Sequence, residues 1–208
     1  MAGTARENIL KRIKQALKQP VPVPFPGTSA DAHFVPMAQE PVLEFAERFT
    51  ALQGKFCYCS SVSELAEQLN ALATKREWKK IYCRDNRLKE LLQSNGYAPD
   101  YHSGLASCDA AITGCEYLVA RTGSILLGSG NESGRTVSVY APIHICIAYA
   151  HQVKADIADG IDALFEPGKK YPSMVTLATG PSRTADIEKT LVVGVHGPKE
   201  VYCFLIEE

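Results

Sequence analysis

The amino-acid sequence predicts an α/β fold, in which helices flank an open and largely parallel sheet. From residue 42 onward, short apolar runs typical of strands alternate with segments whose apolar residues recur at helical spacing. Such alternation is typical of parallel strands that are connected by helices. At 208 residues, the chain is also long enough to bury a substantial core.

The first expected element is a basic amphipathic helix over residues 7–18. Its apolar residues share one face: Ile9, Leu10, Ile13 and Leu17. Half of the 12 prolines follow between Pro20 and Pro41, and they exclude a long helix or a central strand there. We therefore predict an N-terminal helix with a Pro-rich linker over residues 1–41 and an α/β domain over residues 42–208. The helix is expected to dock on the protein itself or on a partner subunit rather than on a membrane.

The first half of the α/β domain is expected to alternate regularly between helices and strands. Ser61 and Glu64 have the spacing of a capping box, which predicts a helix start, and Asn95-Gly96 is typical of a helix end. The expected elements are a helix over 42–52, a strand over 55–59, a helix after Ser61, a strand over 80–83 and a helix over 88–92.

The second half is richer in strand patterns. Short strands are expected over 109–113, 118–121, 124–127, 136–140 and 143–148. A helix over 153–164 is expected before Pro167-Gly168, and a last strand over 201–206.

The turn over residues 179–184 is the strongest candidate for a binding loop. It follows a strand expected over 174–178, and ligands of α/β sheets tend to lie beyond the carboxyl ends of parallel strands. A short helix that starts near Ser182 would present free N–H groups, hydroxyls and the Arg183 guanidinium to an anion. The alternative is a tight turn in which Arg183 pairs with Asp186 for local structure.

Two further loops are expected to complete this anion site. The turn at residues 122–124 is expected to face the binding loop, and the loop at residues 128–135 either closes over a ligand or forms a solvated hairpin turn. The predicted ligand-binding residues are Thr122, Gly123, Ser124, Arg135, Thr179, Gly180, Ser182, Arg183 and Thr184. His196, flanked by Gly194 and Gly197, is the one candidate for a catalytic residue, with a capping or packing role as the alternative. His144 in its apolar strand is expected to be a core histidine.

Three motifs resemble the LUD-domain family and, within it, the lactate utilization protein C (LutC) group. The longest is T-G-P-S-R-T-A-D-I-E over 179–188, followed by G-V-H-G-P over 194–198. The other two are A-R-T-G-S-I-L-L over 120–127 and P-I-H-I over 142–145. The resemblance implies a sheet similar to the NagB/RpiA/CoA-transferase-like fold. It also implies a role in oxidising L-lactate to pyruvate together with LutA-like and LutB-like iron–sulfur proteins.

One residue departs from the pattern of the family. Related sequences often read A-E-T-G where this chain reads Ala120-Arg121-Thr122-Gly123. A glutamate there would invite comparison with the catalytic glutamate of CoA transferases, so Arg121 argues against covalent transferase chemistry at this position. We expect Arg121 to be a further group that could hold an anionic metabolite or cofactor.

The composition excludes several classes of protein. The net charge of −1 gives no electrostatic footprint for nucleic acid. No apolar run is long enough to span a bilayer and the N-terminus lacks a signal core, so a cytoplasmic protein is expected. The 7 cysteines form no C-x-x-C pair. We therefore expect no disulfide framework and no metal or iron–sulfur cluster in this chain alone.

Two other function classes stay open at this point. One is a stand-alone enzyme that acts on a phosphate- or CoA-bearing substrate, and the other is a non-catalytic assembly module that uses the N-terminal helix. Whether this chain is itself catalytic, and whether it forms a homo-oligomer, does not follow from the sequence.

Overall fold

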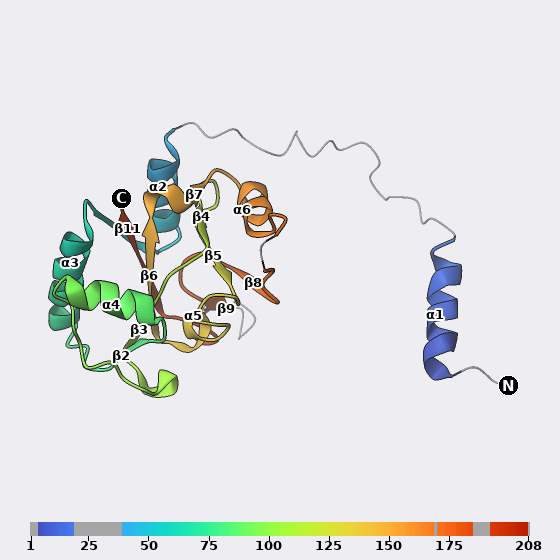
Figure 1. Ribbon diagram of the computed structural model, residues 1–208, viewed down its shortest axis with the longest axis horizontal. Helices are drawn as coiled ribbons and strands as arrows, with labels where there is room; N and C mark the ends of the chain where they lie inside the picture. The colour runs from blue at the N-terminus through green and yellow to red at the C-terminus, as the bar shows by residue number, and fades with distance from the viewer. Residues whose placement is uncertain (1–3, 19–38, 169, 185–191, 208) are drawn as a thin grey trace. The chain divides into compact units, whose positions relative to one another are not determined.

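The computed structural model of the protein describes residues 4–18, 39–168, 170–184 and 192–207 (Figure 1). The chain divides into two compact units, Met1–Pro36 and Met37–Glu208. The expected Pro-rich linker and the acidic residues Asp186 and Glu188 lie outside the described residues.

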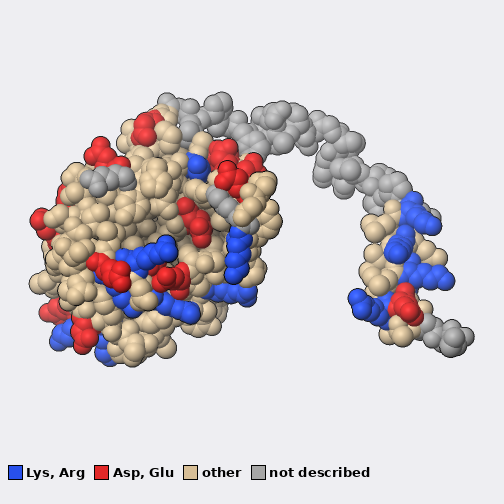
Figure 2. Space-filling view, in the orientation of Figure 1, with Lys and Arg blue, Asp and Glu red and all other residues tan. Residues whose placement is uncertain are grey.

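The smaller unit contains helix α1 (Ala5–Ala16). Its first turn is closed by a capping box, because Thr4 and Glu7 each accept a hydrogen bond from the other's backbone N–H. The four residues of the apolar stripe, from Ile9 to Leu17, are 47% to 78% exposed. Lys and Arg side chains gather on this helix, as Figure 2 shows.

A five-stranded parallel sheet forms the centre of the larger unit. Its strands are β1 (Lys55–Cys59), β2 (Ile81–Cys83), β3 (Ala110–Thr113), β6 (Ile143–Tyr149) and β11 (Glu200–Ile206). Their order across the sheet is β1-β11-β6-β3-β2, and every neighbouring pair is parallel. Strand β11, the last in sequence, therefore lies between β1 and β6.

Both faces of this sheet are buried, which explains why its long strands are nearly continuous apolar runs. On one face, Ile145 of β6 and Phe204 of β11 share a core with helices α3 (Val62–Lys75) and α4 (Asn86–Ser94). On the other face, Cys146 and Cys203 share a core with helix α2 (Pro41–Ala51) and with a second sheet.

The helix termini follow their sequence signals closely. Ser61 caps α3 by accepting a hydrogen bond from the N–H of Glu64 at 3.2 Å, but the Glu64 carboxylate returns to Ser60 rather than to Ser61. Asn95 caps the end of α4, and Gly96 takes a φ of 92° after it.

The second sheet has four strands in the order β7-β4-β5-β8. They are β4 (Tyr117–Val119), β5 (Ser124–Gly128), β7 (Val153–Lys154) and β8 (Val175–Ala178), and helix α6 (Ile157–Leu164) packs against β4 and β7. Strand β8 pairs antiparallel with β5. The strand before the T-G-P-S-R-T turn thus belongs to this sheet and not, as expected, to the parallel one.

Three expected elements differ in the structure. The helix expected over 153–164 begins only at residue 157, because residues 153 and 154 form strand β7. Residues 136–140 were expected as a strand, but Val137–Tyr140 is a short helix, α5, whose Val137 is buried against Cys108 and Ala111. The helix expected near Ser182 is absent within the described residues. There the backbone is extended, and β9 (Arg183–Thr184) pairs antiparallel with β10 (Val192–Val193).

The remaining described elements are two short 3-10 helices, η2 (Leu105–Ser107) and η3 (Ala150–Gln152). Within the described ranges, no helix combines the length and apolar character needed to cross a bilayer. On the visible face of the larger unit, acidic and basic side chains are interspersed (Figure 2).

Candidate functional site

The structure brings three of the predicted ligand-binding hydroxyls together. Ser124 Oγ donates to Thr122 Oγ1 at 2.8 Å and lies 2.7 Å from Thr179 Oγ1. The β5–β8 ladder pairs Ile125 with Ala178, so Ser124 and Thr179 come to lie opposite each other at its end. Ser124 is only 2% exposed. These hydroxyls therefore bond mainly to one another, and they tie the starts of two turns together.

Gly123 and Gly180 are required by close packing against α2. Both have positive φ values, 59° and 72°. A Cβ on Gly123 would lie 2.5 Å from the backbone nitrogen of Phe49, and one on Gly180 would lie 2.4 Å from the carbonyl oxygen of Leu52. Only glycine fits such a conformation and such an approach. Both glycines therefore allow their turns to pack closely against the C-terminal half of α2.

The predicted arginines do not converge on one anion site. Arg183 is exposed in β9, and Thr184 pairs with Val192 across the β9–β10 ladder. The guanidinium of Arg135 donates to Ser173 Oγ, ahead of β8. The expected pair between Arg183 and Asp186 lies outside the described residues.

Arg121 is engaged in an ion pair within the protein. Its Nε lies 2.5 Å from Asp156 Oδ2 and its Nη2 lies 2.8 Å from Oδ1, which is a bidentate arrangement. The hydrogen bond to Arg121 lowers the pKa of Asp156, which is the N-cap residue of α6. In the structure the guanidinium thus anchors the start of this helix, and its expected role in holding a ligand stays a prediction.

The G-V-H-G-P loop forms the wall of a pocket of about 440 Å³. Its lining residues come from α5, from this loop and from the positions directly before β6 and β11: Val139, Tyr140, Pro142, Gly194, Val195, His196, Gly197 and Lys199. Three backbone hydrogen bonds hold the loop in place. Ser182 N–H donates to Pro198 O at 2.9 Å, Gly194 N–H donates to Ser182 O at 2.9 Å, and Lys199 N–H donates to Pro142 O at 2.8 Å.

Ser182 links the two halves of the long C-terminal motif. A Cβ on Gly197 would lie 2.8 Å from the Ser182 Cβ, so the T-G-P-S turn lies directly against the G-V-H-G-P loop. Of the predicted ligand-binding residues, Ser182 is the one whose contacts place it beside this pocket.

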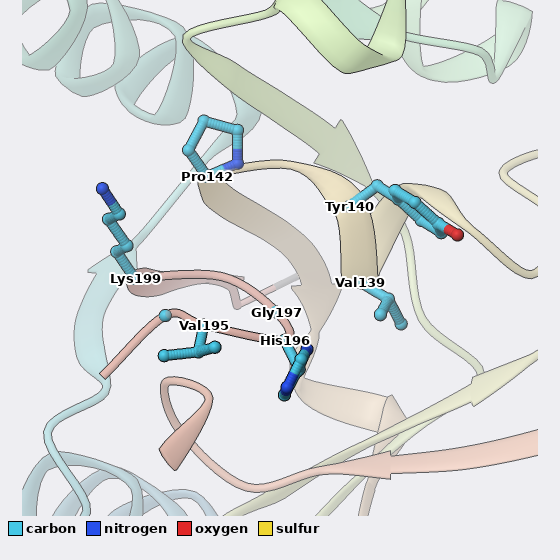
Figure 3. A pocket seen from close by; sticks show the side chains of 8 residues that line it. Val139, Tyr140, Pro142, Val195, His196, Gly197 and Lys199 are labelled. Atoms are coloured by element: carbon cyan, nitrogen blue, oxygen red, sulfur yellow. The ribbon is translucent and has the colours of Figure 1, made fainter. Parts of the chain in front are cut away.

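The pocket combines cationic, hydrogen-bonding and apolar groups. Lys199 contributes an ammonium group and His196 an imidazole, and no acidic residue lines the pocket among those that the structure describes. In the part of the chain that the structure describes, the backbone N–H groups of Val195, His196 and Gly197 donate no hydrogen bond. Figure 3 shows Lys199 and Tyr140 on opposite sides of the pocket, with His196 and Val139 beside each other at its edge. This arrangement can bind an anion that also has an apolar part.

The pocket lies at the amino ends of two parallel strands. Pro142 directly precedes β6, and Lys199 directly precedes β11. The sequence predicts a site at the opposite end of the sheet, but the strand before the T-G-P-S-R-T turn is antiparallel to β5 and lies outside the parallel sheet. Sequence reasoning also missed Lys199, although it follows the G-V-H-G-P motif at once, and Tyr140, whose segment has an alternating strand-like pattern.

His144 is fully buried on β6, as expected for a core histidine. Its Nε2 lies 2.8 Å from Thr113 Oγ1, while its Nδ1 has no hydrogen-bond partner among the described residues. Burial lowers the pKa of His144 to about 4, so the imidazole is neutral near pH 7.

The cysteines are distributed over several elements of the fold. All are free thiols: Cys57, Cys59, Cys83, Cys108, Cys115, Cys146 and Cys203. The hydrogen bond to Cys146, together with burial, raises the pKa of Cys115 well above its usual value. The Cys115 thiol is therefore held in its neutral form. Within the described ranges, no three His, Cys, Asp or Glu side chains are grouped so that they could hold a metal ion.

Comparisons with curated proteins identify relatives of this chain. The family model of the LUD domain matches residues 89–206. Lactate utilization protein C of Halalkalibacterium halodurans is 35% identical over 103 residues, which are 48% of this chain and 44% of that protein. The protein of the same name from Deinococcus radiodurans is 31% identical over 109 residues, or 52% and 51% of the two chains. An uncharacterized protein of Neisseria meningitidis is 36% identical over 100 residues, or 47% and 42%. The chain thus spans about half the length of these relatives.

A solved structure shares the fold. The crystal structure of a DUF162 family protein from Deinococcus radiodurans matches with a TM-score of 0.57 at 21% identity, covering 79% of this chain and 95% of that chain. The predicted architecture, with helices around a largely parallel sheet, is confirmed.

Proposed function

The chain belongs to the LUD-domain family, and we propose that it is a component of the system that oxidises L-lactate to pyruvate. Several relatives carry the name Lactate utilization protein C, and this common name is the observation that supports the proposal most directly. We propose LutA-like and LutB-like iron–sulfur proteins as its partners and the cytoplasm as its location. Electrons from lactate would pass through the clusters of those partners. A relationship to the NagB/RpiA/CoA-transferase-like fold is part of the same proposal.

The contribution of this chain, in this proposal, is to bind an anionic ligand in the pocket lined by His196 and Lys199. The second half of the longest family motif lines that pocket, and the described lining residues offer cationic and N–H groups. The hydroxyl cluster around Ser124 and the glycines at positions 123 and 180 support it by fixing the turns behind it. Arg183, at the exposed edge of β9, is proposed as a secondary contact for an anion.

Helix α1 is proposed as the contact with the partner proteins. It is capped, it carries an exposed stripe of aliphatic residues, and none of its residues is buried. A helix of this length is marginal in isolation, so a partner that covers its stripe would stabilise it. A second copy of the chain is the other partner to be considered.

Growth of the source organism tests the proposed function. Deleting the gene is expected to abolish growth on L-lactate while leaving growth on pyruvate intact. Restoring the gene with His196→Gln and Lys199→Gln together should not restore growth on L-lactate, whereas His151→Gln, a change of an exposed histidine elsewhere, should. A deletion strain that grows on L-lactate like the wild type would contradict the proposal.

Co-purification tests the role of α1. Full-length protein with Ile13→Glu should lose its iron–sulfur partners, because a carboxylate interrupts the apolar stripe. The matched control is Gln15→Glu, which adds the same charge on the opposite side of the helix and should retain the partners. Loss of the partners in both variants would indicate a charge effect rather than docking of the stripe.

A stand-alone enzyme that acts on a phosphate- or CoA-bearing substrate would use the same pocket. Conversion of such a substrate by the purified protein without partners would favour that alternative.

A further inference from the structure

The volume of the pocket and the residues on its two opposite sides indicate the size and the chemistry of its ligand. Lys199 and Tyr140 lie on opposite sides of it (Figure 3). Its volume of about 440 Å³ is within the range of roughly 300–1,000 Å³ that is typical of sites for drug-sized molecules. A three-carbon acid such as lactate is much smaller. If lactate bound Lys199, the side of the pocket around Tyr140 would stay uncovered.

The Lys199 side is suited to an acidic group. The ammonium of Lys199 and the imidazole of His196 belong to the same loop as the N–H groups of Val195, His196 and Gly197, which donate no hydrogen bond within the described residues. Charge-assisted hydrogen bonds from such donors favour a carboxylate or a phosphate. Among the residues that the structure describes, the lining contains Lys199 and His196 and no carboxylate, which favours an acidic group at this side.

The Tyr140 side is suited to a flat apolar group. Tyr140 is 70% exposed and Val139 is 38% exposed, although both are large apolar side chains next to a pocket. An aromatic ring of a ligand can stack on the Tyr140 ring and cover Val139 at the same time. Val195, which is also exposed, extends this apolar surface toward Lys199.

We propose that this pocket binds an anion larger than lactate, in which a carboxylate or phosphate is joined to a planar ring. The acidic group lies against Lys199 and the ring lies against Tyr140. The inference rests on the proposed function in one respect only, namely that this pocket is the ligand site of the chain.

Calorimetry and thermal unfolding of the full chain with a matched set of probes test this assignment. AMP and benzoate carry both an acidic group and a ring, inorganic phosphate and L-lactate carry the acid alone, and adenosine carries the ring alone. The two ring-bearing anions are expected to bind more tightly, and to raise the midpoint of unfolding more, than any probe that lacks one of the two parts.

Two substitutions test the contributions of Lys199 and Tyr140 to ligand binding separately. Lys199→Gln should weaken AMP binding by roughly 10- to 100-fold, since it removes a charge-assisted hydrogen bond. Tyr140→Ala should weaken AMP binding by roughly 2- to 10-fold and leave phosphate binding unchanged, while Tyr140→Phe should bind AMP like the wild type. Lys80→Gln and Tyr58→Ala change exposed residues elsewhere and serve as controls.

The outcomes of these experiments distinguish failure of the ligand assignment from failure of the proposed function. It is wrong if neither AMP nor benzoate binds more tightly than phosphate and lactate, or if AMP binding is equal in wild type, Lys199→Gln and Tyr140→Ala. If lactate alone binds tightly and depends on Lys199, the pocket holds the small acid, and the proposed function stands without this inference. If AMP binds as expected but the deletion strain grows on L-lactate, the proposed function fails and this ligand assignment stands.

Discussion

Mild acid is predicted to destabilise the protein through His144. The experiment lowers the pH from 7 to 5 and compares the wild type with His144→Gln, which removes the contribution of this imidazole to the pH dependence of stability. Glutamine keeps a polar group near Thr113 but does not titrate in this range. The exposed residue His151 supplies the control variant, His151→Gln.

The magnitude follows from the difference between the folded and the ordinary pKa of this imidazole. Burial lowers the pKa of His144 from 6.5 to about 4. Between these values the unfolded chain binds a proton that the folded chain excludes, so the stability present above pH 6.5 is lost as the pH falls toward 4. At roughly 1.4 kcal/mol per pH unit, the full loss is about 3 kcal/mol. About 2 kcal/mol of it is expected between pH 7 and pH 5.

Urea-induced unfolding at pH 7, 6 and 5 measures this loss. Wild type and His151→Gln should lose about 2 kcal/mol more unfolding free energy over this range than His144→Gln does. His144→Gln is expected to be less stable than the wild type at pH 7, because a well-packed ring is replaced. The quantity compared between the two proteins is therefore the change of unfolding free energy with pH, not its absolute value. Equal pH dependence of His144→Gln and wild type would refute the reasoning and show that this imidazole can accept a proton in the folded state.

Two further predictions concern groups that the structure assigns to stability rather than to binding. Gly180→Ala should lower the unfolding free energy by roughly 1–3 kcal/mol, because its Cβ would meet the carbonyl oxygen of Leu52 at 2.4 Å and its φ is 72°. Thermal scans measure the effect, with Gly130→Ala as the control because Gly130 has open space around it. An unchanged midpoint of unfolding for Gly180→Ala would show that the turn can move away from α2. Arg121→Gln should lower the unfolding free energy by about 1 kcal/mol or less, because the ion pair with Asp156 is partly exposed to solvent. It should leave the binding of AMP and phosphate unchanged. A variant that keeps its full stability but loses phosphate binding would show that Arg121 contacts the ligand.

The sequence allows the architecture to be predicted because the strong signals are local. The strands β6 and β11 are long apolar runs, and such runs identify buried strands whatever their partners are. Ser61 and Asn95-Gly96 mark helix termini within a few residues. Local patterns do not identify the secondary structure of short segments. Residues 136–140 are an example, because five alternating residues fit a strand as well as the single helical turn that the structure has there.

The site is harder to predict because its parts meet through distant contacts. Arg121 pairs with Asp156, 35 positions away, and no local pattern indicates that pairing. Strand β8 pairs with β5 instead of joining the parallel sheet, which moves the T-G-P-S turn next to the G-V-H-G-P loop. The long motif leads to the same region, because Ser182 of its first half bonds to the G-V-H-G-P loop that lines the pocket.

The position of β11 has a consequence for how the protein forms during synthesis. Residues 200–206 complete the central sheet by pairing with β1 on one side and β6 on the other, and Lys55 bonds to Tyr202 across 147 positions. While the ribosome is still making the segments before them, β1 and β6 each have an open edge of N–H and C=O groups. The central sheet is therefore expected to close only after translation has passed residue 206 and the strand has left the exit tunnel. Such a late, long-range closure favours slow folding and transient binding by chaperones.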